Sequence, residues 1–309
     1  IAQKLYEEGL ITYHRTDSFN LSDVFIKASR EYIEKELGKE YLSPEIKIFK
    51  TKAKSAQEAH EAIRPVDCNN QKSKIQQELG NDYANLYDLI FRRAIATQMS
   101  DAVFSSTKIV GEIKKTHTYT FETNGRIMKF QGFLKVYSVK EDDETILPEI
   151  LVDEILDYSD ARISEHTTTP PPRYNEASLV SSLEKHGIGR PSTYAPIIST
   201  LYDRLYLEKE EGRLTPTEIG IIVSDFLVKN FGNIDDVPFT ARMEEELDEI
   251  AEGKIKWQEV LKEFYVPFEK QLKATEGIEH VEITVEYSDR MCPEDKGRLV
   301  VRQSCDPFS

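Results

Sequence analysis

The chain has 309 residues, of which 39% are hydrophobic and 31% are charged, and its formal net charge is −15. This length suits about two domains of roughly 100–200 residues each, and no apolar run approaches the roughly 20 residues that a membrane-spanning helix needs. Three cysteines are too few for a disulfide framework in a chain of this length, so we expect a protein of the reducing cytoplasm.

The negative charge is concentrated in one stretch. Residues 235–249 hold seven acids and one base, Arg242, whereas residues 46–65 hold five bases and two acids. Nucleic-acid phosphates attract Lys and Arg, so any surface for DNA must be local. We expect residues 235–249 to form an acidic helix that faces away from such a surface.

The first third of the sequence, residues 1–99, is predicted to be helical. Ser22 can cap a helix that carries Phe25 and Tyr32 on one face and ends at Gly38. Residues 83–94 also place their apolar side chains at helical spacing.

A further short helix is predicted before residue 65. Ser55 and Glu58 fit a capping box, and Pro65 would close the helix. Residues 100–165 differ from this helical part, because they alternate and are rich in β-branched and aromatic residues. Asn124-Gly125 is a strong signal for a hairpin turn there.

Prolines 170–172 precede a second helical part, residues 166–275. We expect Asn175 to cap one helix and Ser192 to cap the next, with the turn HGIGRP between them and a short hairpin after them. Residues 217–275 again follow helical spacing. The sequence begins at Ile1 and stops abruptly after RQSCDPFS, so we expect an internal piece of a longer polypeptide.

Tyr13 lies in the stretch GLITYHRTDS, after a short apolar run and next to cationic residues. A phenol is a nucleophile only when its proton is removed or its anion is stabilised. Arg15 carries a permanent charge that matches phosphate oxygens, and in an extended chain it would point to the same face as Tyr13. The alternative interpretation is a half-buried tyrosine beside a surface arginine.

Two further stretches could bind phosphate. His60 and Arg64 would share one face of the predicted short helix. The turn at Gly187 and Gly189 brings Arg190 and the adjacent hydroxyls to a helix N-terminus, which is favourable for an anion. The alternatives are a surface helix of mixed charge and an ordinary tight turn between helices.

A zinc site is not predicted within the chain. Cys292-Pro-Glu-Asp295 has one cysteine where a zinc ribbon has two, and Cys305 lies 13 residues further on. Four ligands are therefore not present.

Taken together, these stretches resemble the motifs of the type IA DNA topoisomerases, in particular those of bacterial topoisomerase I. The stretches are GLITYHRTDS, AQEAHEAIRP, EASLVSSLEKHGIGRPSTYAPIISTLYDR, LTPTEIG and FTARMEEELDEIAEG, in the order expected for the family. The match covers nearly the whole chain.

The resemblance implies an ATP-independent enzyme that cuts one DNA strand, passes another strand and reseals the cut, and so relaxes negative supercoils. Tyr13 would form a 5′-phosphotyrosine link, and Arg15 would hold the scissile phosphate. Single-stranded and negatively supercoiled DNA would be the partner of a monomeric, nucleoid-associated protein. The DNA-binding residues would be His60, Arg64, Arg173, Arg190, Ser192 and Thr193.

The implied fold is multidomain α+β, mainly helical: the central, toroidal part of the family fold. It would contain a tyrosine-bearing helical domain (1–99), a β-rich arch segment (100–165), a single-strand-binding base with a helix-turn-helix-like pair (166–275) and the start of a truncated zinc-ribbon-like tail (276–309). Mg²⁺ would bind to acids of an upstream domain that this chain lacks, so the fragment alone should be inactive. Zinc would belong to a missing C-terminal tail, with Cys292 as a partial ligand.

The sequence departs from the family pattern in two places. His14 stands where bacterial members often have Met, and Asp295 stands where the zinc motif usually has its second cysteine. Alternative functions are topoisomerase III, the topoisomerase part of reverse gyrase, a non-catalytic single-stranded DNA-binding module, or a structural domain with no role in DNA binding.

Overall fold

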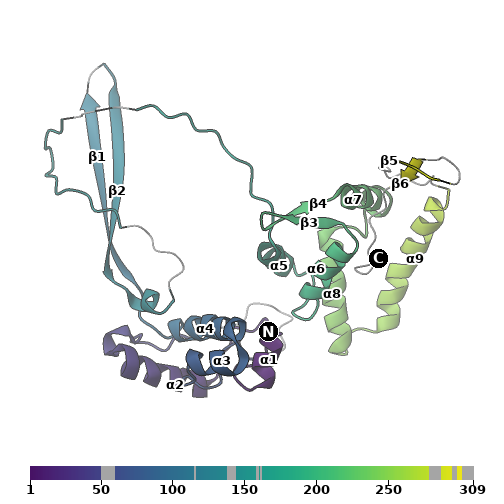
Figure 1. The fold of residues 1–309 in the computed structure, drawn as a ribbon, viewed down its shortest axis with the longest axis horizontal. Coiled ribbons are helices and arrows are strands. Elements are labelled where there is room, and N and C mark those ends of the chain that lie inside the picture. Colours follow the sequence, from purple (N-terminus) through teal and green to yellow (C-terminus); the bar gives the residue numbers. More distant parts are fainter. Residues whose placement is uncertain are drawn as a thin grey trace. The chain divides into compact units, whose positions relative to one another are not determined.

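A computed structural model describes residues 1–49, 60–114, 116–137, 144–157, 160, 162–277, 287–293 and 298–300. The chain divides into two units, Ile1–Glu165 and His166–Ser309, which are described separately (Figure 1). The mixture of helices with small antiparallel sheets agrees with the α+β prediction. The four-segment division made from the sequence remains a prediction, as does the toroidal arrangement.

The first unit is built around helix α4, which contributes to two hydrophobic clusters. Ala84 and Tyr87 pack in one cluster, and Ala94 and Ile95 in the other. The helices of this unit are α1 (Ala2–Glu7), α2 (Asp23–Tyr32), a π-helical turn η1 (Ile33–Leu37), a 3₁₀ turn η2 (Lys39–Tyr41), α3 (Lys72–Leu79) and α4 (Asn81–Ala96).

The predicted helix after Ser22 is confirmed. Ser22 is the N-cap of α2, Phe25 is buried, and the helix continues through η1 to Gly38, whose φ of 112° favours glycine. The capping detail was wrong, however, because the side chain of Ser22 accepts no backbone hydrogen bond. Its Oγ accepts instead from Arg64 Nη2, at 3.2 Å.

The predicted helix at residues 55–65 is wrong where it can be judged. Residues 60–64 are not helical, and Pro65 pairs with Ile11 in an antiparallel bridge. The proposed capping residues, Ser55 and Glu58, lie outside the described residues. Tertiary pairing has overridden the local helical pattern here.

The β segment forms a long two-stranded hairpin of β1 (Val103–Lys114) and β2 (Thr118–Phe130), seen in Figure 1. The predicted turn at Asn124-Gly125 is wrong, because both residues lie inside β2, opposite Lys108 and Thr107. The glycine serves a close approach instead. A Cβ on Gly125 would lie 2.6 Å from the side chain of Leu147 and 2.8 Å from the carbonyl oxygen of Thr145.

The base of the hairpin is fixed to the helical body through the 3₁₀ turn η3 (Gly132–Lys135). Phe133 N donates to Ser100 O at 2.9 Å, and Phe130 packs on Tyr41 with ring centroids 4.9 Å apart. Gly132 has a φ of 52°, and a Cβ there would lie 2.4 Å from the backbone of Asp101. This position therefore requires glycine.

The second unit has α5 (Glu176–Lys185), α6 (Tyr194–Asp203), a hairpin of β3 (Leu207–Glu210) and β4 (Arg213–Pro216), α7 (Glu218–Phe231), α8 (Val237–Ala251), α9 (Trp257–Thr275) and a pair of β5 (Tyr287–Met291) and β6 (Arg298–Val300). The predicted helix pair and short hairpin are confirmed. Asn175 caps α5 in a capping box, but Thr193 rather than Ser192 is the N-cap of α6.

Hydrophobic burial in the second unit is sparse. None of the helices from α5 to α8 has a buried residue. Leu214 of β4 and Val260 of α9 are the buried apolar side chains among its described residues. Polar contacts between elements therefore matter more here than in the first unit.

No helix in the described part of the chain is both long and apolar enough to cross a membrane.

Replacing Gly132 with alanine should destabilise the first unit by at least about 2 kcal/mol, because left-handed backbone strain and a clash with the backbone add. Gly111→Ala in β1 is the matched control, since a Cβ there meets nothing within 4 Å. We expect the control to be neutral or to stabilise by up to about 1 kcal/mol.

The measurement is the rate of thiol labelling of Cys68 as a function of urea, with the other two cysteines replaced by serine. Cys68 is buried in the first unit, and burial raises the pKa of its thiol to about 11, so it reacts when the unit opens. Equal labelling of both glycine variants would contradict the assigned role of Gly132.

Candidate functional site

Three aromatic rings surround Tyr13 in the first unit. Its ring centroid lies 5.3 Å from that of Tyr6, 5.4 Å from that of His14 and 5.5 Å from that of His60. Tyr13 is nevertheless 37% exposed. The tyrosine is thus held by its neighbours on several sides and remains accessible from solvent.

Residues far apart in the sequence meet at this point because two backbone segments pair. Thr12 N donates to Arg64 O at 2.9 Å, and Val66 N donates to Leu10 O at 3.0 Å. The hydroxyl of Thr12 donates to Ala62 O at 2.7 Å and accepts from Arg64 N at 2.9 Å. This pairing brings the segment that carries His60 alongside the segment that carries Tyr13.

The backbone around Tyr13 is bent at Thr12 and at His14–Arg15 rather than regularly extended. The alternation rule that placed Tyr13 and Arg15 on one face therefore does not apply, and the contact of Arg15 with a phosphate stays a prediction. Arg15 is exposed. Burial, together with the charge of Arg15, lowers the pKa of His14, so its neutral form is favoured at neutral pH.

The guanidinium of Arg64 is directed into the protein. Its side chain is only 13% exposed, and it pairs with Glu61 at 2.6 Å. It also donates to Ser22 Oγ and Pro65 O, and it lies 4.9 Å from the ring centroid of Phe25. The structure thus does not present Arg64 and His60 on one helix face, as the sequence had suggested.

In the second unit, the glycine turn between α5 and α6 is bound to α8. Gly187 and Gly189 have φ values of 73° and 77°, and Gly189 N donates to Glu244 Oε1 at 3.0 Å. Arg190 Nη2 pairs with Asp248 at 2.7 Å and also donates to Glu244 O. The hydrogen bond and charge of Asp248 raise the pKa of Arg190 against the effect of burial.

These contacts involve α8, the acidic helix that we expected to face away from any DNA surface, and that expectation remains a prediction. Two of its carboxylates, on Glu244 and Asp248, face the glycine turn. The side chain of Arg190 is 23% exposed, and its guanidinium is engaged in this ion pairing. Its predicted contact with DNA remains a prediction.

The other predicted strand-binding residues of the second unit are exposed. Ser192 and Thr193 precede α6, and Thr193 Oγ1 accepts from Arg190 N at 2.8 Å. Arg173 accepts from Arg213 through its carbonyl oxygen. Arg173 and Tyr174 also line a largely apolar cavity of about 540 Å³ with residues of α5, α6, β3, β4 and α7.

The described residues contain no group of three or more His, Cys, Asp or Glu side chains placed to hold a metal ion. Cys292 is partly exposed, and Cys305 and Asp295 lie outside the described residues. The part of the chain that is described thus offers no donor set that fits Mg²⁺ or Zn²⁺, and no chemical step is derived through either ion.

The chain is similar to known proteins over nearly its whole length. A family model described as DNA topoisomerase matches residues 1–262. The chain is 40% identical to DNA topoisomerase 1 of Campylobacter jejuni, covering 98% of the chain and 44% of that protein. It belongs to the type IA DNA topoisomerases, and is most like bacterial topoisomerase I.

Two further relatives agree. DNA topoisomerase 1 of Helicobacter pylori is 39% identical over 98% of the chain and 42% of that protein. The structure of full-length topoisomerase I from Thermotoga maritima matches with a TM-score of 0.69 and 31% identity, over 92% of this chain and 45% of that one. The topoisomerase chain thus spans less than half the length of these relatives.

Some residues that pack around the candidate site lie outside its motifs, and the sequence did not indicate them. Tyr6 packs edge-to-face on Tyr13 from α1, and nothing in its spacing distinguishes it from a surface tyrosine. The partners of Arg190 lie more than 50 residues away, so no local pattern could reveal them. The ion pair of Glu61 with Arg64, at a spacing of three, could have been proposed from the sequence.

Arg190→Ala should destabilise the second unit by about 1–3 kcal/mol, because it leaves Glu244 and Asp248 without their cation. Arg242→Ala on the same helix is the matched control. Its side chain is 66% exposed and lies 3.8 Å from Glu246, so its loss should cost at most about 0.5 kcal/mol. Amide hydrogen exchange in peptides that cover residues 187–193 measures the difference. Equal protection in both variants would rule out the role assigned to Arg190.

Proposed function

We propose that the chain is the tyrosine-bearing and strand-binding part of an ATP-independent type IA topoisomerase that relaxes negatively supercoiled DNA. Family membership and the accessible position of Tyr13 beside His60 support this proposal. The single observation that carries it is the meeting of the tyrosine motif with the histidine motif, which are 47 residues apart in the sequence.

The proposed reaction exchanges one phosphate ester for another. The phenol oxygen of Tyr13 forms a bond to a backbone phosphorus of single-stranded DNA, the bond from phosphorus to the 3′ oxygen breaks, and the phenol proton leaves as the 3′ hydroxyl forms. The number of ester bonds is unchanged, so resealing needs no ATP. Arg15 would hold the phosphate oxygens, and His60 would contact the strand beside them.

Other parts of the proposal concern groups and partners outside the described residues. Mg²⁺ would be held by acids of a domain outside this chain, and it would stabilise negative charge on the phosphate oxygens. Zinc would belong to a C-terminal tail. The enzyme would act as a monomer on the DNA of the bacterial nucleoid, with Arg173, Arg190, Ser192 and Thr193 near the bound strand.

A non-catalytic single-stranded DNA-binding module is the second candidate. It would use the same exposed basic side chains, such as Arg15 and Arg173, without any bond to Tyr13. Such a module would bind single strands in a salt-dependent manner without forming any covalent adduct.

Tyr13→Phe should abolish covalent adducts with single-stranded DNA in a polypeptide of the relatives' full length that carries this chain. The substitution removes the nucleophilic oxygen and keeps the ring. Tyr6→Phe is the matched control, because Tyr6 is a neighbouring exposed tyrosine whose hydroxyl has no proposed role, and we expect normal adduct yield. Denaturing gels with labelled oligonucleotides measure the yield. Adducts that persist at normal yield in Tyr13→Phe would remove Tyr13 from the reaction.

A further inference from the structure

The segment from residue 60 to residue 65 has no regular secondary structure of its own. Its backbone is held on one side by the hydrogen bonds to Leu10 and Thr12, and Ala62 N donates to Asn20 O at 2.8 Å. The other restraint comes from a side chain. Arg64 reaches from the segment to the first turn of α2.

The guanidinium of Arg64 has three kinds of anchor. Nε donates to Glu61 Oε2 at 2.6 Å, Nη2 donates to Ser22 Oγ at 3.2 Å, and the group lies over the ring of Phe25. Ser22 and Phe25 belong to the start of α2, whereas Glu61 is the neighbour of His60. Arg64 therefore links Glu61, the residue next to His60, to the start of α2.

We infer that Arg64 is a positioning residue, which holds His60 against Tyr13 and does not itself bind DNA. A phosphate contact would require the guanidinium to leave Glu61, Ser22 and Phe25 and to expose a side chain that is now 13% exposed. This inference rests on the proposed strand cleavage for its consequence in activity. Its geometric part concerns the chain alone.

Arg64→Ala should lower the rate of adduct formation by roughly 10- to 100-fold, as expected when a group near the reacting atoms moves by about 1 Å. The decisive measurement is a double-mutant cycle with His60→Ala. If Arg64 acts through His60, then Arg64→Ala has little further effect in the His60→Ala background. The same loss in both backgrounds would overturn the inference.

A second measurement separates positioning from direct contact with phosphate. The logarithm of DNA affinity falls linearly with the logarithm of salt concentration, and the loss of a cation that contacts a phosphate makes this slope less steep by about 1. The loss of a positioning residue leaves the slope unchanged. Arg92→Ala is the matched control, since Arg92 pairs with Asp88 on α4 and takes no part in the site. We expect it to leave both the slope and the adduct rate unchanged.

A third measurement does not depend on strand cleavage. In the chain with labelled histidine and tyrosine, the nuclear Overhauser contact between the rings of His60 and Tyr13 should be lost or weakened in Arg64→Ala and kept in Arg92→Ala. A contact of unchanged strength in Arg64→Ala would overturn the inference, even if the proposed function failed because the unsubstituted protein formed no adducts.

If Arg64→Ala does not fold, Glu61→Gln and Ser22→Ala each remove one anchor and keep the arginine. Like Arg64→Ala, both variants should weaken the contact between the rings of His60 and Tyr13 and lower the rate of adduct formation. Glu61→Gln should have the larger effect, because it removes a charged partner of Arg64. Normal rates and an unchanged ring contact in both variants would count against the inference.

Discussion

The short antiparallel contact between residues 10–12 and 62–66 is the constraint on which the candidate site depends. It includes two backbone hydrogen bonds and the hydrogen bonds that join the Thr12 hydroxyl to Ala62 and Arg64. Without it, Tyr13 and His60 would belong to unrelated loops. Neither segment is long enough to form a strand, and the hydroxyl of Thr12 supplies hydrogen bonds between them that a longer β-ladder would supply through its backbone.

Much of the fold could be predicted where local chemistry decides it. The periodicity of α2, the capping box at Asn175 and the glycine at residue 38 follow from their neighbours in the sequence. The errors occur where distant parts of the chain intervene. Gly125 resembles a turn glycine but serves a close approach by Leu147, a contact that its flanking residues do not encode.

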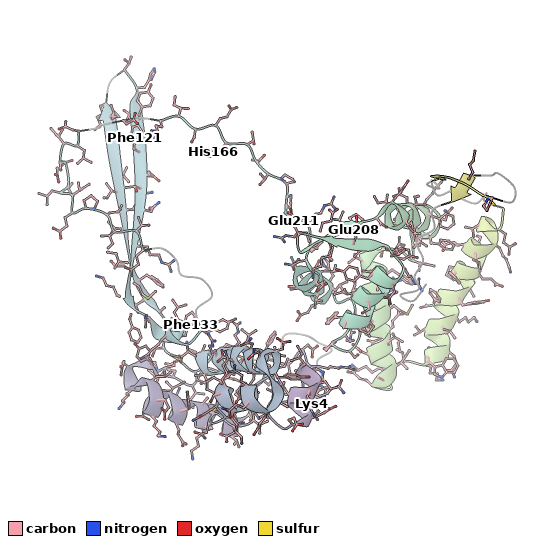
Figure 2. The ribbon with its side chains drawn as sticks, viewed as in Figure 1. Lys4, Phe121, Phe133, His166, Glu208 and Glu211 are labelled. Carbon is pink, nitrogen blue, oxygen red and sulfur yellow. The ribbon has the colours of Figure 1, made fainter. Side chains whose placement is uncertain are left out.

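The candidate site shows the same division. The sequence indicated Tyr13 and His60 through their motifs, and the structure brings their rings together (5.5 Å). Arg64 and Arg190 were selected because they are cations near glycine or histidine, yet both are paired with carboxylates. A pattern of residue types cannot tell an arginine that awaits a phosphate from one whose partner is already present. Figure 2 shows the side chains along the ribbon, among them Phe121 on β2, which is exposed.

The scarcity of buried apolar residues in the second unit affects how its affinity for DNA should be interpreted. The attachment of its glycine turn to α8 is largely electrostatic, through Arg190, Glu244 and Asp248. Added electrolyte weakens partly exposed ion pairs of this kind, and it also weakens contacts with phosphates. A titration with salt would thus loosen the receptor and displace the ligand at once, and its steepness would overstate the number of phosphates that the protein neutralises.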